Sequence, residues 1–394
     1  MFVILASKRS MDLAMVGTMS NAIPPDAIHG PVIPVPLSKE ALSRRVKEIA
    51  GPLVRQNARA PRKSLAGIRI LGTGMATGSE RIDNCQLAEL GCDSEWIVQR
   101  TGIKSRYHTN EDQAVSDMCI AAAKKCLANS KVDPSSVDMI VIGTLTPDHA
   151  SPSTACIVQA ALDAPAAMAM DLNAACSGFV YSLITASQFV ATGSAKCALV
   201  VGADKTSMIA DPKDLKTYPL FGDGAGAVLL TADQTPNQNT ASGILDFHLG
   251  AEGKQGHTLL VPAGGSRMPL CQEALDNRMQ YLKMDGRTVF KWAVRIMPEA
   301  VQGALDRTGM TLDDIDLIIP HQANIRIIDA AIETLGVDRE KVFVNVDRYG
   351  NTSAASIPIA LHEAVQQGRV KRGSNVLMVG FGAGLTWGSC LFRW

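Results

Sequence analysis

The chain has 394 residues, of which 46% are hydrophobic, and it carries 38 basic and 38 acidic side chains. This composition allows a large buried core, and the balanced charge gives no global attraction to nucleic acid or to an anionic membrane. The apolar runs fall short of the roughly 18 residues that a membrane span needs. The nine cysteines form no C-x-x-C pair, so free thiols in the cytoplasm are expected rather than a zinc or thioredoxin-like site.

Residues 1–66 differ in composition from the rest of the chain. They hold seven prolines, with ten basic side chains against four acidic ones. Prolines interrupt helices and strands, so a partly disordered N-terminal extension is expected over 1–66. A gene start placed too far upstream and a partner-binding arm remain open as alternatives.

From Gly67 onward, short β-branched runs alternate with alanine-rich helical stretches. This alternation is typical of an α/β fold with buried strands. The expected strands include residues 68–71, 139–143, 198–202, 227–230, 317–319 and 377–380.

One spacing recurs along the chain. Asp138 and Asp316 each precede an apolar strand after a similar acidic turn, and they are 178 positions apart. Asn173 and Asn351 have the same separation, as do the strand-end glycines 202 and 380. We therefore expect two copies of one βα-rich unit, over 67–237 and 238–394, joined as an intramolecular pseudo-dimer whose site draws groups from both halves.

Cys176 is a candidate nucleophile. It precedes an apolar helical stretch, and a helix N-terminus offers partial positive charge and free N–H groups to a thiolate. Small neighbours at 174, 175, 177 and 178 leave room for a substrate carbonyl. Taken alone, the pattern also fits a buried structural cysteine.

Three further segments are typical of reacting groups. His321 follows a buried strand, and strand ends are where α/β enzymes place such side chains. Asn351 opens a turn of small residues before a helix, where it also fits a helix cap. The glycine-rich turn at 382–384 could present backbone N–H groups to an oxyanion. Two other glycine-rich segments, 72–78 and 222–227, lack the context of a phosphate loop and are interpreted as tight turns.

Together these elements resemble β-ketoacyl-acyl carrier protein synthase III, the initiating condensing enzyme of dissociated fatty acid synthesis. The resemblance covers about 67–394 and rests on WIVQRTGIK at 96–104, NAACSGF at 173–179, FGDGAG at 221–226, HQAN at 321–324, GNTSAAS at 350–356 and FGAGLTWGS at 381–389. It implies a thiolase-like α/β fold, in which two pseudo-duplicated halves form a five-layered αβαβα core. It also implies a homodimer, and chemistry that needs no metal or bound cofactor.

By this resemblance, Cys176 takes an acyl group from an acyl-CoA primer, and malonyl-acyl carrier protein then enters. His321 and Asn351 stabilise the enolate left by decarboxylation, which attacks the acyl-cysteine to give β-ketoacyl-acyl carrier protein. Phe381 is implied to favour loss of carbon dioxide by excluding water. The oxyanion donors are implied to be backbone groups of Cys176 and of the turn Gly382, Ala383 and Gly384.

The resemblance also implies the binding residues. The adenine of CoA would stack on Trp96, with Arg100 and Thr101 near the phosphates. Gly286 and Asn324 would lie along the pantetheine.

Docking of the acidic carrier protein is assigned by the resemblance to two cations, Lys291 and Arg326.

Three positions depart from the family pattern. Leu215 stands where arginine is usual beside the adenine, and Ala383 where glycine is common. Ser151 replaces a phenylalanine that closes the acyl pocket of the neighbouring subunit, so a primer longer than acetyl is expected.

Related chemistries remain as alternatives. A specialised-metabolite ketosynthase or an acyltransferase would share the fold, although an acyltransferase has no need for both His321 and Asn351. A degradative thiolase would place a second cysteine near position 381, where this chain has Phe381. A non-catalytic partner subunit would be free to lose Cys176.

Overall fold

The computed structural model describes residues 65–232 and 242–394. The extension predicted over 1–66 lies outside this part of the chain, apart from its last two residues, and so does the predicted boundary at 237/238. Leu65–Ala66 form strand β1, which pairs antiparallel with β9 (Gly243–Ala251). Residues 65 and 66 therefore add a strand to the sheet of the C-terminal half.

Two five-stranded sheets form the core of the described residues. The first has the order β2 (Ile68–Thr77), β8 (Gly224–Ala232), β7 (Cys197–Asp204), β5 (Met139–Gly143) and β6 (Met168–Leu172). The second has the order β1, β9, β14 (Thr386–Arg393), β13 (Asn375–Gly382) and β12 (Leu317–Pro320). The pairs β5–β7 and β12–β13 are parallel, and the pairs β7–β8 and β13–β14 are antiparallel.

The predicted duplication is visible in these two sheets. The order β2-β8-β7-β5 in the first corresponds to β9-β14-β13-β12 in the second. Strands β7 and β13 have the same length, and their first residues, Cys197 and Asn375, are 178 positions apart. The repeat in the sequence thus marks structurally equivalent strands.

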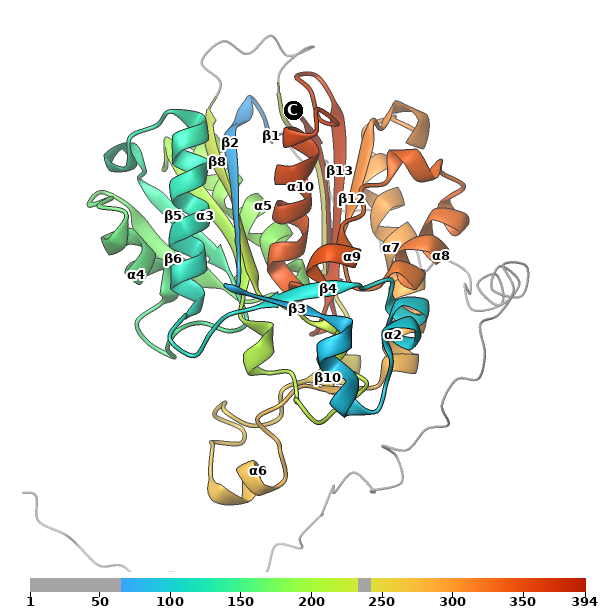
Figure 1. Ribbon diagram of the computed structural model, residues 1–394. Coiled ribbons are helices and arrows are strands. Elements are labelled where there is room, and N and C mark those ends of the chain that lie inside the picture. The colour runs from blue at the N-terminus through green and yellow to red at the C-terminus, as the bar shows by residue number, and fades with distance from the viewer. Residues whose placement is uncertain (1–64, 233–241) are drawn as a thin grey trace, which may run out of the picture. The chain divides into compact units, whose positions relative to one another are not determined.

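Helices separate and cover the sheets, giving the five αβαβα layers that were predicted (Figure 1). Outside the first sheet lie α3 (Val115–Ser130) and α4 (Thr154–Ala161), and between the sheets lie α5 (Gly178–Ala191) and α10 (Ser356–Gln366). Outside the second sheet lie α7 (Gly286–Leu305) and α8 (Ile325–Leu335). Strands buried on both faces are expected to be continuously apolar, which is how they appear in the sequence.

Shorter elements connect the layers. The short helices are α2 (Ser94–Thr101), α6 (Gln272–Asp276) and α9 (Val346–Tyr349), and two-stranded sheets pair β3 (Glu80–Asp83) with β4 (Ser105–His108) and β10 (Leu259–Leu260) with β11 (Lys283–Met284). The 3₁₀ turns are η2 (Asn84–Leu90), η3 (Pro134–Ser136), η4 (Ala175–Ser177), η5 (Thr206–Met208), η6 (Tyr218–Leu220), η7 (Gly253–Thr258), η8 (Leu312–Asp314), η9 (Arg339–Lys341) and η10 (Ser353–Ala355).

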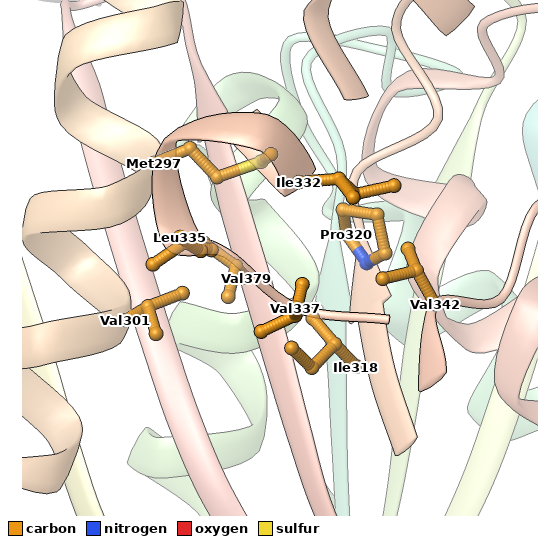
Figure 2. A pocket seen from close by; sticks show the side chains of 9 residues that line it. All are labelled: Met297, Val301, Ile318, Pro320, Ile332, Leu335, Val337, Val342 and Val379. Carbon is orange, nitrogen blue, oxygen red and sulfur yellow. The ribbon is translucent and has the colours of Figure 1, made fainter. Parts of the chain in front are cut away.

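A small cavity lies between the second sheet and the helices that cover its outer face. It lies among α7, α8 and the strands β12 and β13, and Figure 2 shows the apolar side chains that line it. Its volume is about 10 Å³ and its lining carries no charged side chain. We therefore assign it to core packing and not to ligand binding.

The glycine-rich segment 72–78 was predicted to form a tight turn, and that prediction is wrong. Gly72 and Gly74 lie inside strand β2, against helix α3. A Cβ atom at Gly74 would lie 2.2 Å from the carbonyl oxygen of Ala122 and 2.5 Å from the backbone nitrogen of Cys126. Because these residues have no side chain, helix α3 can lie close against strand β2.

The Gly74 contact gives a stability prediction. Because Gly74→Ala puts a methyl group against helix backbone, we expect it to lower the free energy of unfolding by about 3 kcal/mol. Gly253→Ala is the matched control, because a Cβ there meets no atom within 4 Å. Urea unfolding followed by circular dichroism measures both. Equal stability of the two variants would contradict the packing described here.

Candidate active site

Two equivalent turns meet between the sheets, where α5 and α10 begin. In η4 the N–H of Ala175 donates to Oδ1 of Asn173 at 3.1 Å, and in η10 the N–H of Ser353 donates to Oδ1 of Asn351 at 2.9 Å. Ala175 and Ser353 both have left-handed backbone conformations, with φ of 45° and 51°. The duplicated sequence therefore folds into the same turn twice, and one copy presents Cys176 while the other presents Asn351.

Cys176 is buried, with 8% of its surface exposed. Burial raises the pKa of its thiol to about 12, and the charge of Asp204 acts in the same direction. The N-terminus of α5 and the Ser353 hydroxyl, whose Oγ lies 3.5 Å from Sγ, favour the thiolate. The resting residue is a thiol, so the nucleophilic role predicted for Cys176 would require its proton to leave.

The glycine-rich turn lies directly against Cys176. A Cβ atom at Gly382 would lie 2.7 Å from Cβ, 2.9 Å from the backbone nitrogen and 3.1 Å from Sγ of Cys176. Gly384 has a φ of 136°, a conformation that requires glycine, whereas Ala383 does not have a positive φ and so accommodates its methyl group. The backbone of Gly382 can thus reach an oxyanion formed at Cys176.

His321 is a buried, neutral imidazole at the end of β12. The backbone N–H of His321 donates to the carbonyl of Val379 at 2.7 Å, and its ring Nδ1 lies 2.7 Å from Oγ of Ser356. Burial lowers the pKa of His321 to about 3. Because the Gln322 N–H donates to Ser356 Oγ at 3.4 Å, we assign the serine proton to Nδ1, which leaves Nε2–H as a donor.

Asn351 and Phe381 complete the surroundings of His321. Oδ1 of Asn351 accepts a hydrogen bond from the N–H of Ser353, so Nδ2 of Asn351 is oriented as the donor of the carboxamide. Asn351 is also held by its backbone, which bonds to Leu220 and Gly222. Phe381 is buried and meets the His321 ring edge to face, with ring centroids 5.2 Å apart. Two neutral donors therefore stand beside an apolar ring.

A fully buried carboxylate, not predicted from the sequence, lies beside the same turn. Oδ1 of Asp204, at the end of β7, accepts from the hydroxyls of Thr144 and Thr146 at 2.9 and 3.0 Å and from the N–H of Leu145 at 2.8 Å. Oδ2 accepts from the N–H of Ala354 at 3.1 Å. Asp204 therefore ties the loop after β5 to the turn that carries Asn351.

The sequence holds a signal for the residues that were missed. Asp204 precedes Gly382 by 178 positions, so the two residues are equivalent in the duplication. Ser353 and Ser356 lie inside the motif that identified Asn351, yet their contacts depend on the other half or on another strand. The spacing thus places Asp204 opposite a residue of the predicted oxyanion turn, although it does not show the contacts of the carboxylate.

Trp96 and Arg100 lie together on α2. The guanidinium of Arg100 is 4.3 Å from the centre of the Trp96 ring. Leu215, which replaces the usual arginine, packs in the same small apolar cluster as Trp96. The structure thus brings together an indole, a guanidinium and an apolar neighbour, while the role of this group in binding stays a prediction.

Two of the other predicted CoA residues have their polar groups engaged within the protein. Thr101 is buried, and its hydroxyl donates to the carbonyl of Ile97 at 2.7 Å. Oδ1 of Asn324 accepts the N–H of Arg326 at 2.8 Å, which caps α8, and its Nδ2 donates to the Arg100 carbonyl at 3.1 Å. The Thr101 bond closes the last turn of α2, and the Asn324 bonds join α2 to α8. Gly286, the first residue of α7, is exposed.

Positive charge gathers near Trp96. Arg326 lies over the Phe290 ring, with its guanidinium carbon 5.7 Å from the ring centre. Burial and the charge of Arg100 lower the pKa of Arg326, which places the two cations close together. Lys291 is exposed on α7. This arrangement is compatible with an anionic ligand or partner.

Ser151 lies apart from these groups, in an open cleft of about 440 Å³. It is exposed, and the cleft is also lined by Ala169 and Met170 of β6, the edge strand of the first sheet. The lining of the cleft also includes Asn173, at the start of the turn that carries Cys176.

The described residues show no group of three or more histidine, cysteine or acidic side chains placed to hold a metal ion. Over the same residues, no helix is long and apolar enough to cross a membrane.

The neutral state of His321 predicts a pH dependence of stability. Its pKa is lower in the folded protein than the ordinary value of about 6.5 in the unfolded chain, so the unfolded chain takes up a proton as the pH falls below 6.5. Wild type should therefore lose about 2 kcal/mol more than His321→Gln between pH 7.5 and 5.0. Urea unfolding at both pH values measures this difference. The exposed His257→Gln is the control and should follow wild type; a His321→Gln variant that also follows wild type would refute the assignment.

Comparisons with known proteins agree with this geometry. The profile for 3-oxoacyl-[acyl-carrier-protein] synthase III matches residues 170–253, and that for its C-terminal part matches 305–394. A β-ketoacyl-[acyl-carrier-protein] synthase III from Rhodopirellula baltica is 51% identical over 344 residues, covering 84% of this chain and 99% of that protein.

Solved structures agree as well. The 3-oxoacyl-[acyl-carrier-protein] synthase III from Aquifex aeolicus is 44% identical with a TM-score of 0.76, over 83% of this chain and 100% of that one. A priming β-ketosynthase from a polyketide biosynthetic pathway is 32% identical with a TM-score of 0.76, over 86% of this chain and 99% of that one. The predicted thiolase-like fold is confirmed, and the chain belongs to the β-ketoacyl-[acyl-carrier-protein] synthase III family.

Proposed function

We propose that this chain condenses an acyl-CoA primer with malonyl-acyl carrier protein, with loss of carbon dioxide, to give the first β-ketoacyl-acyl carrier protein of fatty acid synthesis. One observation carries the proposal: a buried thiol, a neutral imidazole and a carboxamide donor converge from the two halves of the fold. Membership of the synthase III family supports the proposed choice of substrates. The catalytic residues we assign are Cys176, His321 and Asn351.

In the first half-reaction Cys176 acts as nucleophile. Its sulfur attacks the thioester carbonyl, the carbon–sulfur bond to CoA breaks, and the primer remains on Cys176 as a thioester. Negative charge on the carbonyl oxygen would be held by backbone N–H groups of Cys176 and of the turn that begins at Gly382. The close contact between these two residues supports this role.

In the second half-reaction the malonyl thioester oxygen takes the place between His321 and Asn351. Nε2–H of His321 and Nδ2–H of Asn351 would stabilise the enolate formed as carbon dioxide leaves. Phe381 supports decarboxylation by keeping water from the carboxylate that is lost. The enolate carbon then attacks the acyl-cysteine, and Cys176 is released as the carbon–carbon bond forms.

CoA and the carrier protein would use the basic surface around α2 and α7. Trp96 and Arg100 suit an adenine with its phosphates, and Lys291 and Arg326 suit the acidic carrier protein. Gly286 stands at the exposed start of α7, beside this surface. Thr101 would act by closing the end of α2, and Asn324 by holding α2 against α8, since their polar groups bond within the protein.

A specialised-metabolite ketosynthase remains a second candidate. The likeness to a priming β-ketosynthase of a polyketide pathway favours it, since that protein matches over nearly its whole length. The catalytic steps would be the same, and the primer would differ. An acyltransferase without decarboxylation has less support, because both enolate donors are in place.

We further propose a homodimer in the cytoplasm. Strand β6 pairs only with β5 among the described strands, which leaves its outer edge available to a second copy, and Met168 on it is 38% exposed. Ser151 lies in the cleft beside this edge, where it could reach a partner's acyl pocket. All nine cysteines are free thiols, as a reducing compartment requires.

The proposed function predicts an acyl-enzyme on Cys176. Incubation with acyl-CoAs of two to twelve carbons should add the acyl mass to intact wild-type protein but not to Cys176→Ala. Malonyl-acyl carrier protein should then clear the adduct, with release of carbon dioxide. Cys156→Ala, which removes an exposed thiol, is the matched control and should behave as wild type. Transfer without carbon dioxide would favour the acyltransferase instead.

The small side chain of Ser151 predicts the chain length of the primer. We expect wild type to accept primers longer than acetyl, and Ser151→Phe to shift the preference toward acetyl by roughly tenfold, because an aromatic ring would shorten the partner's acyl pocket. Rates of acylation across chain lengths measure the shift. Ser136→Phe adds the same ring to an exposed turn and should change nothing. A wild-type profile that peaks sharply at acetyl would contradict the idea.

A further inference from the structure

We propose that Glu363 is a positioning residue for the decarboxylation step: its carboxylate fixes the segment that leads to Asn351 and so holds this donor in place relative to His321. The inference deepens the proposed function and rests on it, because it takes His321 and Asn351 as the donors to the enolate. Glu363 acts through the side chains that it binds.

The segment before Asn351 is the single helical turn α9, which needs support from outside. A helix this short is not stable on its own, because nucleation costs more than one turn of hydrogen bonds returns. Gly350, with φ of 65° and ψ of −159°, is the one residue between α9 and Asn351. The position of Asn351 therefore depends on what holds α9.

Glu363 binds both ends of α9. Its Oε2 accepts from Nδ2 of Asn345 at 2.8 Å, and its Oε1 accepts from the hydroxyl of Tyr349 at 2.7 Å. The guanidinium of Arg348 donates to both carboxylate oxygens, each at 2.6 Å. Three side chains of one short segment thus converge on a single carboxylate, and the arginine pair is bidentate, which fixes its orientation.

The same helix that carries Glu363 also contacts His321. Oγ of Ser356, the first residue of α10, lies 2.7 Å from Nδ1 of His321. Gln322, which follows His321, accepts from the backbone N–H groups of Asn345 and Val346 at 3.0 and 3.2 Å. Helix α10 therefore contacts the imidazole at its start and α9 about two turns later.

The backbone hydrogen bonds of Asn351 lead to the other half of the fold. Its N–H donates to the carbonyl of Leu220 at 2.8 Å, and its carbonyl accepts from the N–H of Gly222 at 3.0 Å. His321 belongs to the C-terminal half, together with α9 and α10. The Glu363 contacts therefore relate the two donors within one half, in addition to the bonds that join the halves.

The Glu363 network is charged and partly shielded from water. Burial acts to raise the pKa of Glu363, but the hydrogen bonds from Arg348, Asn345 and Tyr349 lower it overall, so the carboxylate is ionised at neutral pH. Its side chain is 12% exposed. Water therefore cannot readily replace a partner that is lost.

Glu363→Gln keeps the shape of the side chain and breaks the network. The amide has one acceptor oxygen and turns an NH₂ group toward donors that the carboxylate accepted. Tyr349→Phe is a milder variant, which removes one hydrogen bond and keeps the ring that stacks on Tyr107 with centroids 5.9 Å apart. Asp246→Asn is the matched control, because it breaks an ion pair with Arg307 in the same half, on strand β9.

The experiment times the two half-reactions separately, at saturating substrate. Acylation of Cys176 by acyl-CoA is followed by quenched-flow mass spectrometry, and release of carbon dioxide from malonyl-acyl carrier protein is followed with enzyme that is already acylated. We expect Glu363→Gln to slow carbon dioxide release roughly tenfold and to change acylation by less than about twofold. Tyr349→Phe should slow carbon dioxide release about threefold, and Asp246→Asn should keep both wild-type rates.

Equal slowing of both half-reactions in Glu363→Gln, or wild-type release of carbon dioxide, would overturn the inference. A lower melting temperature with both rates unchanged would assign Glu363 to stability alone and overturn it as well. If Glu363→Gln does not fold, Tyr349→Phe decides by the same comparison. Failure of wild type to be acylated or to release carbon dioxide would instead count against the proposed function, so the two failures are distinguishable.

Discussion

The site depends on the packing of the turns η4 and η10 against each other between the two sheets. A Cβ atom at Gly382 would meet Cys176 within 2.7 Å, and one at Gly202 would lie 2.3 Å from the carbonyl oxygen of Ala354. Each turn is thus held by the strand of the opposite half, and neither can shift without displacing the other. Cys176 from one half and Asn351 from the other keep their relative positions for this reason.

Much of the fold, and the places of Cys176 and His321 in it, could be predicted because their signals are local or repeated. The six strands predicted from apolar runs all lie within observed strands, since strands covered on both faces must be continuously apolar. The spacing of 178 positions identified the duplication, because equal spacing of several anchors reflects equal folding. Cys176 and His321 were predicted from motifs at the start of a helix and the end of a strand, and the structure has both there.

What the sequence did not reveal depends on contacts between distant segments. Ser353 sat inside a recognised motif, but its partner Cys176 is 177 positions away. Asn324 was predicted to lie along the pantetheine, and its Nδ2 also donates to the carbonyl of Arg100, 224 positions away. Gly74 was interpreted as part of a turn because the neighbouring sequence gives no sign of the helix that packs on it. In each case the residue type is evident in the sequence, and its use is set by whatever the fold brings beside it.

The duplication explains why one site holds both neutral and charged groups. Equivalent positions carry Gly382 beside Cys176 and Asp204 beside Ala354, so the Asp204 carboxylate belongs to the turn that does not carry Cys176. Burial keeps His321 neutral, which suits decarboxylation: a protonated imidazole would attract the malonyl carboxylate and stabilise the group that must be lost. A neutral donor acts instead where charge develops, on the enolate oxygen. The same burial keeps Cys176 protonated at rest, so a site that favours decarboxylation also needs a route for the thiol proton.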